Sequence, residues 1–372
     1  MAQHIVLVVA EGLRPAHLER LAARGVLFPR TVAAAPYPSA AFAACLTGMW
    51  PRRNGIFEMY NRGLRVPTLF SAARAHGFRT VLMTDAPSVI GPHLGFTRDT
   101  DTFLPAAPDT IRPQAGRGAR RTLQVVYLSC PPVPGEPGSG ERSWLTDRIE
   151  ELTAGLAGTD YLLGVMGSPR WDWSRTDGSG RPASVESHPV GDAALSGPLL
   201  FLGPGVAAGV RRPERVRGID LAATVVARAG WESRRRLDGD PLPLGPAGGT
   251  DGADRNTYVQ AFVPDREKYE SFVARVTAAG RKTGFLKHTL RAECFYDGPY
   301  RLARYHLPSA VLPTVVLHRW TGECFEPDEN PTRAASLSSR LDAYGAPVLS
   351  RRTNREVPGH LRAQLQAMGY RI

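Results

Sequence analysis

The sequence predicts an α/β fold with a largely parallel central sheet flanked by helices and a small C-terminal antiparallel subdomain. The continuous, β-branched apolar run 5–10 is the first observation, because strands buried on both faces of a parallel sheet show no alternation. The second is the order helix, Gly-aromatic turn and strand in residues 67–84, which is typical of alternating helices and strands. The third is the pair of aromatic and β-branched runs 294–305 and 315–320, which indicates antiparallel strands.

Three segments are predicted from composition. Residues 1–236 form the α/β core, residues 237–255 form a linker rich in Gly, Pro and Asp, and residues 256–372 form a C-terminal α+β subdomain. Apolar spacing and turn residues predict further core elements, namely helices at 17–24, 40–46, 67–76 and 144–156 and strands at 77–84, 122–128 and 161–166. In the C-terminal subdomain they predict strands at 257–263 and 283–290 and helices at 265–279 and 360–369.

Charge gives little support for a nucleic-acid partner. The formal charge is +11, but lysine occurs only at positions 268, 282 and 287, so the excess is almost entirely arginine. A skew toward Arg, Ala, Gly and Pro indicates a GC-rich genome as readily as an anionic partner. The longest basic run, Arg234–Arg236, has no interleaved aromatic residues, so we expect a solvated loop there.

The sequence is that expected of a cytoplasmic protein. No run of about eighteen apolar residues occurs, so no membrane partner is expected. Nothing near Met1 resembles a secretion signal. The four cysteines have no metal-binding or disulfide spacing and are interpreted as free thiols (Cys45, Cys130, Cys294 and Cys324).

The most informative stretch is Pro36–Gly55. Ser39 precedes a run of small residues that ends at Thr47-Gly48, which predicts a helix capped by Ser39 and terminated by glycine. The first turn of a helix presents unpaired N–H groups and the positive end of its dipole, so it can hold an anion. Ser39 is therefore predicted to cap this helix, beside a place that could hold an anion.

This stretch, with its Leu46-Thr47-Gly48 exit and Trp50-Pro51 tail, resembles the nucleophile segment of sulfatases in the alkaline phosphatase superfamily. The resemblance implies an alkaline-phosphatase/sulfatase-like fold and covers nearly the whole chain. Two further segments, 198–205 and 220–230, match architectural motifs of that family, and Glu326–Pro331 resembles the turn that closes its C-terminal subdomain. By the same resemblance, the place of the nucleophile falls on Pro38, with Ser39 beside it.

The positions that hold the metal in the family are largely replaced. The family's Asp-Asp pair corresponds to Glu11-Gly12, and its Ser-Asp-His-Gly after a later strand corresponds to Gly167 and the residues after it. Because a divalent cation held by oxygen ligands needs several carboxylates, no metal or other cofactor is expected. The fallback is a site for Ca, Mg, Mn or Zn rebuilt from Glu11 with Asp172 and His188. Cys45 lies too late in the helix to be a formylglycine precursor and is expected to pack in the core.

Two functional classes remain open. The first is a repurposed, noncatalytic protein of the cell interior, such as a biosynthetic accessory protein, whose old cleft binds an anionic small molecule or a protein partner. Its anion site is edged by Ser39, Glu11, Arg14, Arg52 and Arg53. The second is an active sulfuric or phosphoric ester hydrolase or transferase, with Ser39 as nucleophile and displaced metal ligands from Asp85, Asp172, His188 or Asp192. Glu11 and Asp85 also have simpler interpretations, as residues that cap turns. The oligomeric state is not predicted.

Overall fold

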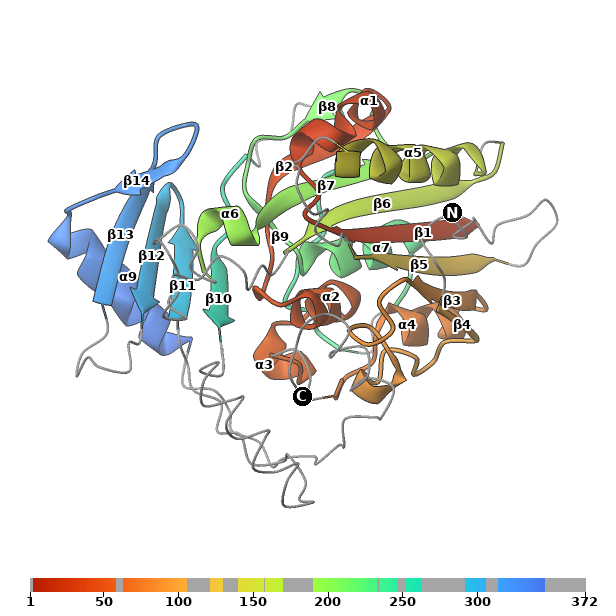
Figure 1. Ribbon diagram of the computed structural model, residues 1–372, viewed down its shortest axis with the longest axis horizontal. Helices are drawn as coiled ribbons and strands as arrows, with labels where there is room; N and C mark the ends of the chain where they lie inside the picture. Colours follow the sequence, from red (N-terminus) through yellow and green to blue (C-terminus); the bar gives the residue numbers. More distant parts are fainter. Residues whose placement is uncertain are drawn as a thin grey trace, which may run out of the picture.

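The computed structural model describes residues 3–57, 63–105, 121–129, 140–156, 158–169, 190–232, 235–246, 252–261, 292–305 and 314–344. These residues form a large mixed sheet with helices on both faces and a smaller antiparallel sheet beside it (Figure 1). No helix among them is long and apolar enough to cross a membrane. The predicted fold class, a largely parallel core sheet with a small antiparallel subdomain, is confirmed.

The large sheet has the strand order β4-β3-β5-β1-β6-β7-β2-β8, with β9 also paired to β2. Its strands are β1 (His4–Glu11), β2 (Gly25–Val32), β3 (Arg79–Thr84), β4 (Thr102–Pro105), β5 (Thr122–Leu128), β6 (Tyr161–Ser168), β7 (Ser196–Leu202), β8 (Val210–Arg211) and β9 (Val216–Arg217). Only β7 runs antiparallel to its neighbours, β6 and β2. The strands from β4 to β6 are parallel, so their carboxyl ends meet at one edge of the sheet.

Two helical layers cover this sheet. One apolar layer packs α2 (Pro38–Thr47), α4 (Leu69–Ala75) and α7 (Asp220–Ala229) on one face, and the other packs α1 (Glu19–Ala22) and α5 (Gly140–Ala154) on the opposite face. The remaining core helices are short: η1 (Pro15–Leu18), α3 (Pro51–Asn54), η2 (Pro92–Leu94) and α6 (Asp192–Leu195). Strands β1, β5 and β6 are buried on both faces, which the sequence predicted for β1 from its continuous apolar run.

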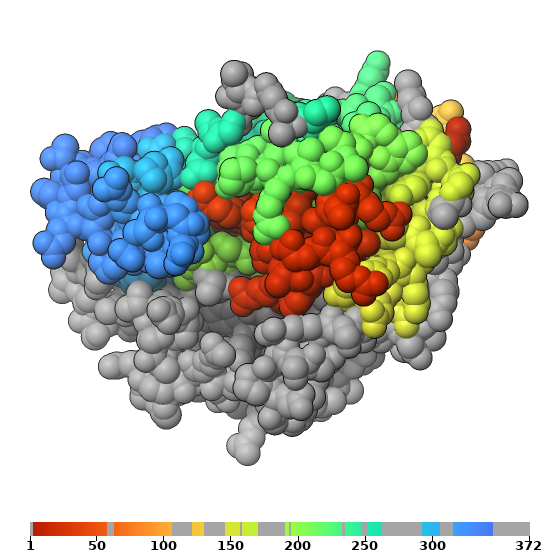
Figure 2. All heavy atoms as spheres, turned by 90° about the horizontal axis from the view of Figure 1, so that it is seen from above, coloured from red at the N-terminus to blue at the C-terminus, as the bar shows by residue number. Residues whose placement is uncertain are grey.

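The second sheet has the order β10-β11-β12-β13-β14 and is antiparallel throughout. Its strands are β10 (Thr257–Ala261), β11 (Ala292–Asp297), β12 (Tyr300–Tyr305), β13 (Thr314–Trp320) and β14 (Phe325–Pro327). Helix α9 (Pro331–Ala343) covers one face, and the other face packs on Val32, Val190 and Leu195 of the core. In Figure 2 this blue part of the chain lies against red N-terminal and green central residues.

Some elements differ from the sequence predictions. Strand β2 and helix α9 were not predicted, whereas β5 has the predicted bounds. The segment 235–246 packs tightly on the core, since Leu242 and Leu244 are buried in its apolar cluster and Asp238 N donates to Gly48 O at 2.8 Å. The predicted elements 265–279, 283–290 and 360–369 lie outside the described residues.

Candidate functional site

The carboxyl edge of the large sheet brings several polar residues together. Glu11 ends β1, Ser168 ends β6, Ser129 follows β5 and Asp85 follows β3. Glu11 and Ser168 are direct register partners in adjacent parallel strands, so their side chains leave the sheet on the same face. That face is the one covered by α2. Ligands of open α/β sheets bind at this edge, which makes it the candidate site.

Glu11 is held by a neighbouring strand. The hydroxyl group of Tyr127, on β5, donates a short hydrogen bond to Glu11 Oε1. Tyr127 is completely buried, and its ring packs edge-on against Phe42 of α2, with 5.2 Å between the ring centroids. Helix α2 and the Glu11 carboxylate are therefore linked through a single side chain, which the sequence analysis did not identify. Its only sequence signal is its place near the end of an apolar strand.

Helix α2 begins two residues earlier than predicted. Tyr37 is the N-cap, Pro38 is the first helical residue and Ser39 is the second, so the prediction that Ser39 caps the helix is wrong. Proline is favoured at the first helical position because that residue has no intrahelical partner for an N–H group. Ser39 is fully buried in the first turn. The helix ends as predicted, at Gly48 with φ 62°.

Ser168 is a site residue that sequence reasoning missed. Its side chain is 5% exposed, and its Oγ has no hydrogen-bond partner within the described part of the chain. Its carbonyl oxygen accepts a hydrogen bond from Gly12 N at 3.0 Å, which fixes the backbone beside Glu11. Buried hydroxyl groups almost always have a partner, so the partner of this one comes from outside the described residues.

Asp85 lies at the same edge of the large sheet, directly after β3. Its Oδ1 accepts a hydrogen bond from Ser129 N at 2.8 Å. The end of β3 thereby binds the first backbone N–H group after the neighbouring strand β5. Burial raises the pKa of Asp85 to about 6, although the hydrogen bonds from Ser129 act in the opposite direction. This carboxyl group therefore titrates at a higher pH than an ordinary aspartate.

Asp85 is expected to give the protein a measurable pH dependence. Because the folded state holds the proton more tightly than the unfolded chain, the free energy of unfolding should fall as pH rises from 3.8 to about 6. Asp85→Asn should remove this slope. As pH rises from 3.8 to about 6, its free energy of unfolding should therefore gain on the order of 2 kcal/mol relative to that of wild type. Urea unfolding at both limits measures the change, and parallel profiles for the two proteins would contradict it.

The three arginines predicted at the anion site lie in different places. Arg14 is exposed just beyond β1, at the carboxyl edge. Arg52 and Arg53 belong to α3, beyond the far end of α2, and a ten-residue helix is about 15 Å long. Arg53 forms an ion pair with Asp238, and the Arg52 guanidinium lies 5.8 Å from the Tyr344 ring centroid. The structure thus places Arg14, but neither Arg52 nor Arg53, at the edge with Glu11.

The fallback metal ligands are only partly described. Asp172 and His188 lie outside the described residues. Asp192 begins α6, and its Oδ1 accepts hydrogen bonds from Ser196 Oγ at 3.0 Å and Tyr296 OH at 3.2 Å. Among the described residues, no group of three or more His, Cys, Asp or Glu side chains could hold a metal ion. Those residues by themselves therefore do not fit a divalent cation.

Cys45 packs as predicted. It is buried in α2, and its Sγ lies 3.4 Å from Met166 Sδ of β6. Burial raises the pKa of its thiol, so the thiolate form is disfavoured. This cysteine therefore serves packing between the helix and the sheet.

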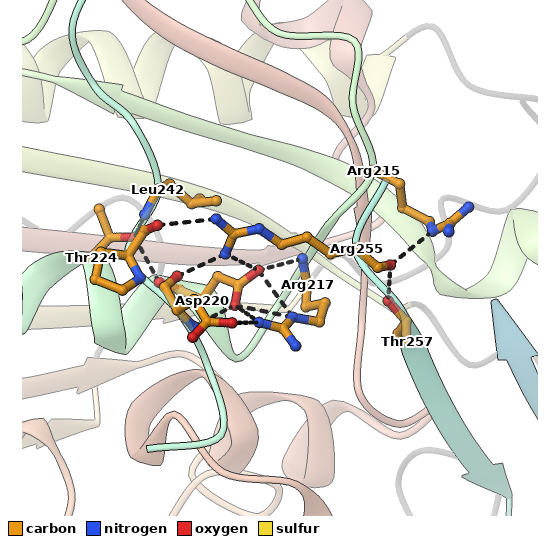
Figure 3. A network of polar contacts seen from close by, with 9 residues as sticks. Arg215, Arg217, Asp220, Thr224, Leu242, Arg255 and Thr257 are labelled. Carbon is orange, nitrogen blue, oxygen red and sulfur yellow. Dashed lines mark hydrogen bonds and ion pairs between the residues drawn. The ribbon is translucent and has the colours of Figure 1, made fainter. Parts of the chain in front are cut away.

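A buried ion network secures α7, the helix beside α2. Asp220 is fully buried and pairs with Arg217 at 2.8 Å and with Arg255 at 3.0 Å (Figure 3). It also accepts hydrogen bonds from the backbone N–H groups of Arg217 and Asp240. Burial alone would lower the pKa of Arg217, but the adjacent Asp220 carboxylate raises it above the ordinary value. Because Arg255 lies two residues before β10, this network ties the second sheet to the core.

The comparisons with known proteins give a consistent fold. The chain matches no family model and no curated protein. A phosphonate monoester hydrolase from Silicibacter pomeroyi has a similar structure, with a TM-score of 0.62, 14% identity and coverage of 95% of this chain and 99% of that one. A 2-O GAG sulfatase gives a TM-score of 0.60 at 12% identity, with 92% of each chain covered.

A protein of the alkaline phosphatase superfamily from Vibrio parahaemolyticus gives a TM-score of 0.57 at 12% identity, covering 92% of this chain and 87% of that one. The similarity extends over both sheets, since nearly the whole chain is covered in each comparison. At these identities it establishes architecture and not activity. The chain therefore has the ester-hydrolase-like fold of the sulfatases and other alkaline phosphatase superfamily members.

Proposed function

We propose that this protein is a repurposed, noncatalytic relative of sulfatases that binds an anionic ligand at the carboxyl edge of its large sheet. The ligand would lie between the first turn of α2 and the ends of β1 and β6. The positive end of a helix dipole favours an anion there. Glu11 would accept a hydrogen bond from a donor group of the same ligand. The predicted cytoplasmic location is retained as part of this proposal.

The observation that carries the proposal is the Ser168 hydroxyl group. It is buried, lacks a partner in the described part of the chain and stands in register with Glu11. Leaving such a group unsatisfied costs about 1–3 kcal/mol, which a ligand oxygen would recover. The Tyr127 hydroxyl group supports the same interpretation. It donates a hydrogen bond to one oxygen of Glu11, and Glu11 stands at a position that holds the metal ion in sulfatases.

The class of ligand is suggested by a structural neighbour. A protein with a TM-score of 0.62, at 11% identity and covering 94% of this chain, was solved in complex with its substrate D-glucosamine-2-N,6-O-disulfate. That ligand combines anionic groups with hydroxyl donors. A sulfated or phosphorylated sugar offers both an anion for α2 and a donor for Glu11. We therefore propose this class of anion for the present site.

The binding role predicts a selective loss in Ser168→Ala. Wild type should show a higher melting temperature in glucosamine 6-sulfate than in sodium chloride of equal ionic strength. Ser168→Ala should bind about 5–10-fold more weakly, because one neutral hydrogen bond is lost. Ser71→Ala is the matched control, since Ser71 lies on α4, away from this edge, and its hydroxyl group donates to Asp99. Equal affinities for wild type and Ser168→Ala would overturn the assignment.

A second candidate is an active ester hydrolase with Ser39 as nucleophile. It is favoured by the position of Ser39 in the first turn of α2, at the same edge as Glu11. Metal analysis for Ca, Mg, Mn and Zn, with aryl sulfate and aryl phosphate turnover, separates the two functions. Turnover that disappears in Ser39→Ala would establish the hydrolase, whereas ligand binding without turnover would support the binding protein.

A further inference from the structure

A buried cationic cluster lies between the two sheets, apart from the proposed ligand site at Glu11, Ser39 and Ser168. Tyr296, Arg301 and His318 are register partners on β11, β12 and β13, so they form one row on one face of the smaller sheet. That face packs against Val190 and Leu195 of the core. We call Arg215, Arg301 and His318 the seam cluster.

Arg301 carries a buried charge without a carboxylate partner. It is 4% exposed, and among the described residues no carboxylate oxygen lies within ion-pair distance of it. One terminal nitrogen donates to the carbonyl oxygen of Val190, but Nε has no hydrogen-bond partner within the described part of the chain. A buried guanidinium group normally has every donor satisfied, so this N–H group still needs an acceptor from outside those residues.

Arg215 adds a second guanidinium group that is not fully satisfied. Its side chain is 1% exposed; Nη1 pairs with Asp254 at 3.2 Å, while Nη2 has no partner among the residues that the structure describes. Its Cζ lies 5.1 Å from the Tyr296 ring centroid, and Arg301 Cζ lies 5.8 Å from the same centroid. Asp254 is shared with Arg30, and Asp192 is bonded to hydroxyl groups. Among the described residues, three arginines (Arg30, Arg215 and Arg301) thus face two carboxylates, so one positive charge there has no carboxylate of its own.

His318 supplies a third nitrogen that has no partner among the described residues. The residue is 7% exposed, and the nitrogen is Nδ1 of its imidazole ring. Burial lowers its pKa to about 4, and the neighbouring Arg301 charge acts in the same direction. The other titratable groups around it are Cys294 and Tyr296 on β11, Tyr305 on β12 and Asp192 on α6. Without a counter-charge, His318 is therefore neutral at pH 7.

We propose that the seam cluster is a second anion site, which holds one small oxyanion between Arg301 and His318. A sulfate, phosphate or carboxylate oxygen would accept from Arg301 Nε and supply the missing negative charge. An anion there would also favour protonated His318, since an adjacent negative charge stabilises the imidazolium form. The site is independent of the proposed function, because neither Glu11, Ser39 nor Ser168 belongs to it.

Sulfate binding by the intact protein tests the site, because sulfate keeps its charge as His318 titrates. Equilibrium dialysis at constant ionic strength should show sulfate affinity rising several-fold between about pH 7.5 and about pH 5.5. His318→Gln should abolish that rise, and Arg301→Gln should weaken binding at least about tenfold. Phosphate and acetate, compared at pH 7.5, identify which oxyanion is preferred.

The matched control is Arg304→Gln, on the same strand but paired with Glu293 and Asp342 beside α9. It should bind sulfate as wild type does. If Arg301→Gln does not fold, His318→Gln still decides the question through the pH dependence. A pH dependence that survives in His318→Gln overturns the proposal, as does the absence of sulfate binding. If Ser168→Ala abolishes all sulfate binding, the anion belongs to the sheet edge and the seam site is wrong.

Discussion

Asp220→Ala is expected to lower the free energy of unfolding by about 3–5 kcal/mol, because it leaves buried positive charge uncompensated. Asp220 is fully buried, and the side chain of its partner Arg217 is only 12% exposed. The substitution also removes the acceptor of two backbone N–H groups, that of Arg217 just before α7 and that of Asp240 in the segment 235–246. Urea unfolding followed by circular dichroism measures the loss.

Asp240→Ala is the matched control for this network. Asp240 also pairs with Arg217, at 2.6 Å, but its side chain is 71% exposed. An exposed ion pair contributes about 0–1 kcal/mol, so this variant should unfold nearly as wild type does. Equal losses in the two variants would show that burial of Asp220 is not the source of its effect.

Phe42→Ala is expected to destabilise the protein by about 3–5 kcal/mol through the cavity that it leaves. Phe42 is completely buried in α2, and its ring packs edge-on against Phe96 at 5.1 Å and Tyr127 at 5.2 Å between centroids. Since Tyr127 bonds Glu11, loss of this ring should also loosen the Glu11 carboxylate. Thermal unfolding gives the stability change, and ligand affinity at the sheet edge gives the effect on the site.

Phe42→Leu and Tyr127→Phe separate the loss of stability from the effect on the Glu11 carboxylate. Leucine fills most of the space, so its loss of stability should be clearly smaller than that of alanine. Tyr127→Phe keeps the contact with Phe42 and removes only the hydroxyl group that holds Glu11. We expect Tyr127→Phe to change ligand affinity more than stability. A large loss of stability with unchanged affinity would contradict the link between α2 and Glu11.

The fold was largely predictable because local patterns agree with it. The runs 5–10, 122–128 and 161–166 are rich in apolar residues, and each lies in a strand of the large sheet that is buried on both faces. Strand β2 was missed because its interior holds Phe28-Pro29-Arg30, where the register with β7 shifts. A proline and a charged residue disrupt the pattern that identifies a strand.

The candidate site was only partly predictable. Glu11 was found because it directly follows an apolar strand, a position that sequence alone reveals. Ser168 was passed over because a serine after a strand is common, and only its register with Glu11 and its buried hydroxyl group distinguish it. Arg53 was placed at the anion site, yet its partner is Asp238, 185 positions away in the sequence.

The order of apolar runs, glycines and prolines by itself determined the α/β architecture of this chain and the place of α2 in it. Those features act through neighbouring residues, so their periodicity can be read without a structure. Partners were decided only by the tertiary structure: Tyr127 for Glu11, Arg255 for Asp220 and Asp192 for Tyr296. These pairs join residues that are distant in sequence, and burial and charge compensation between them depend on how the two sheets pack.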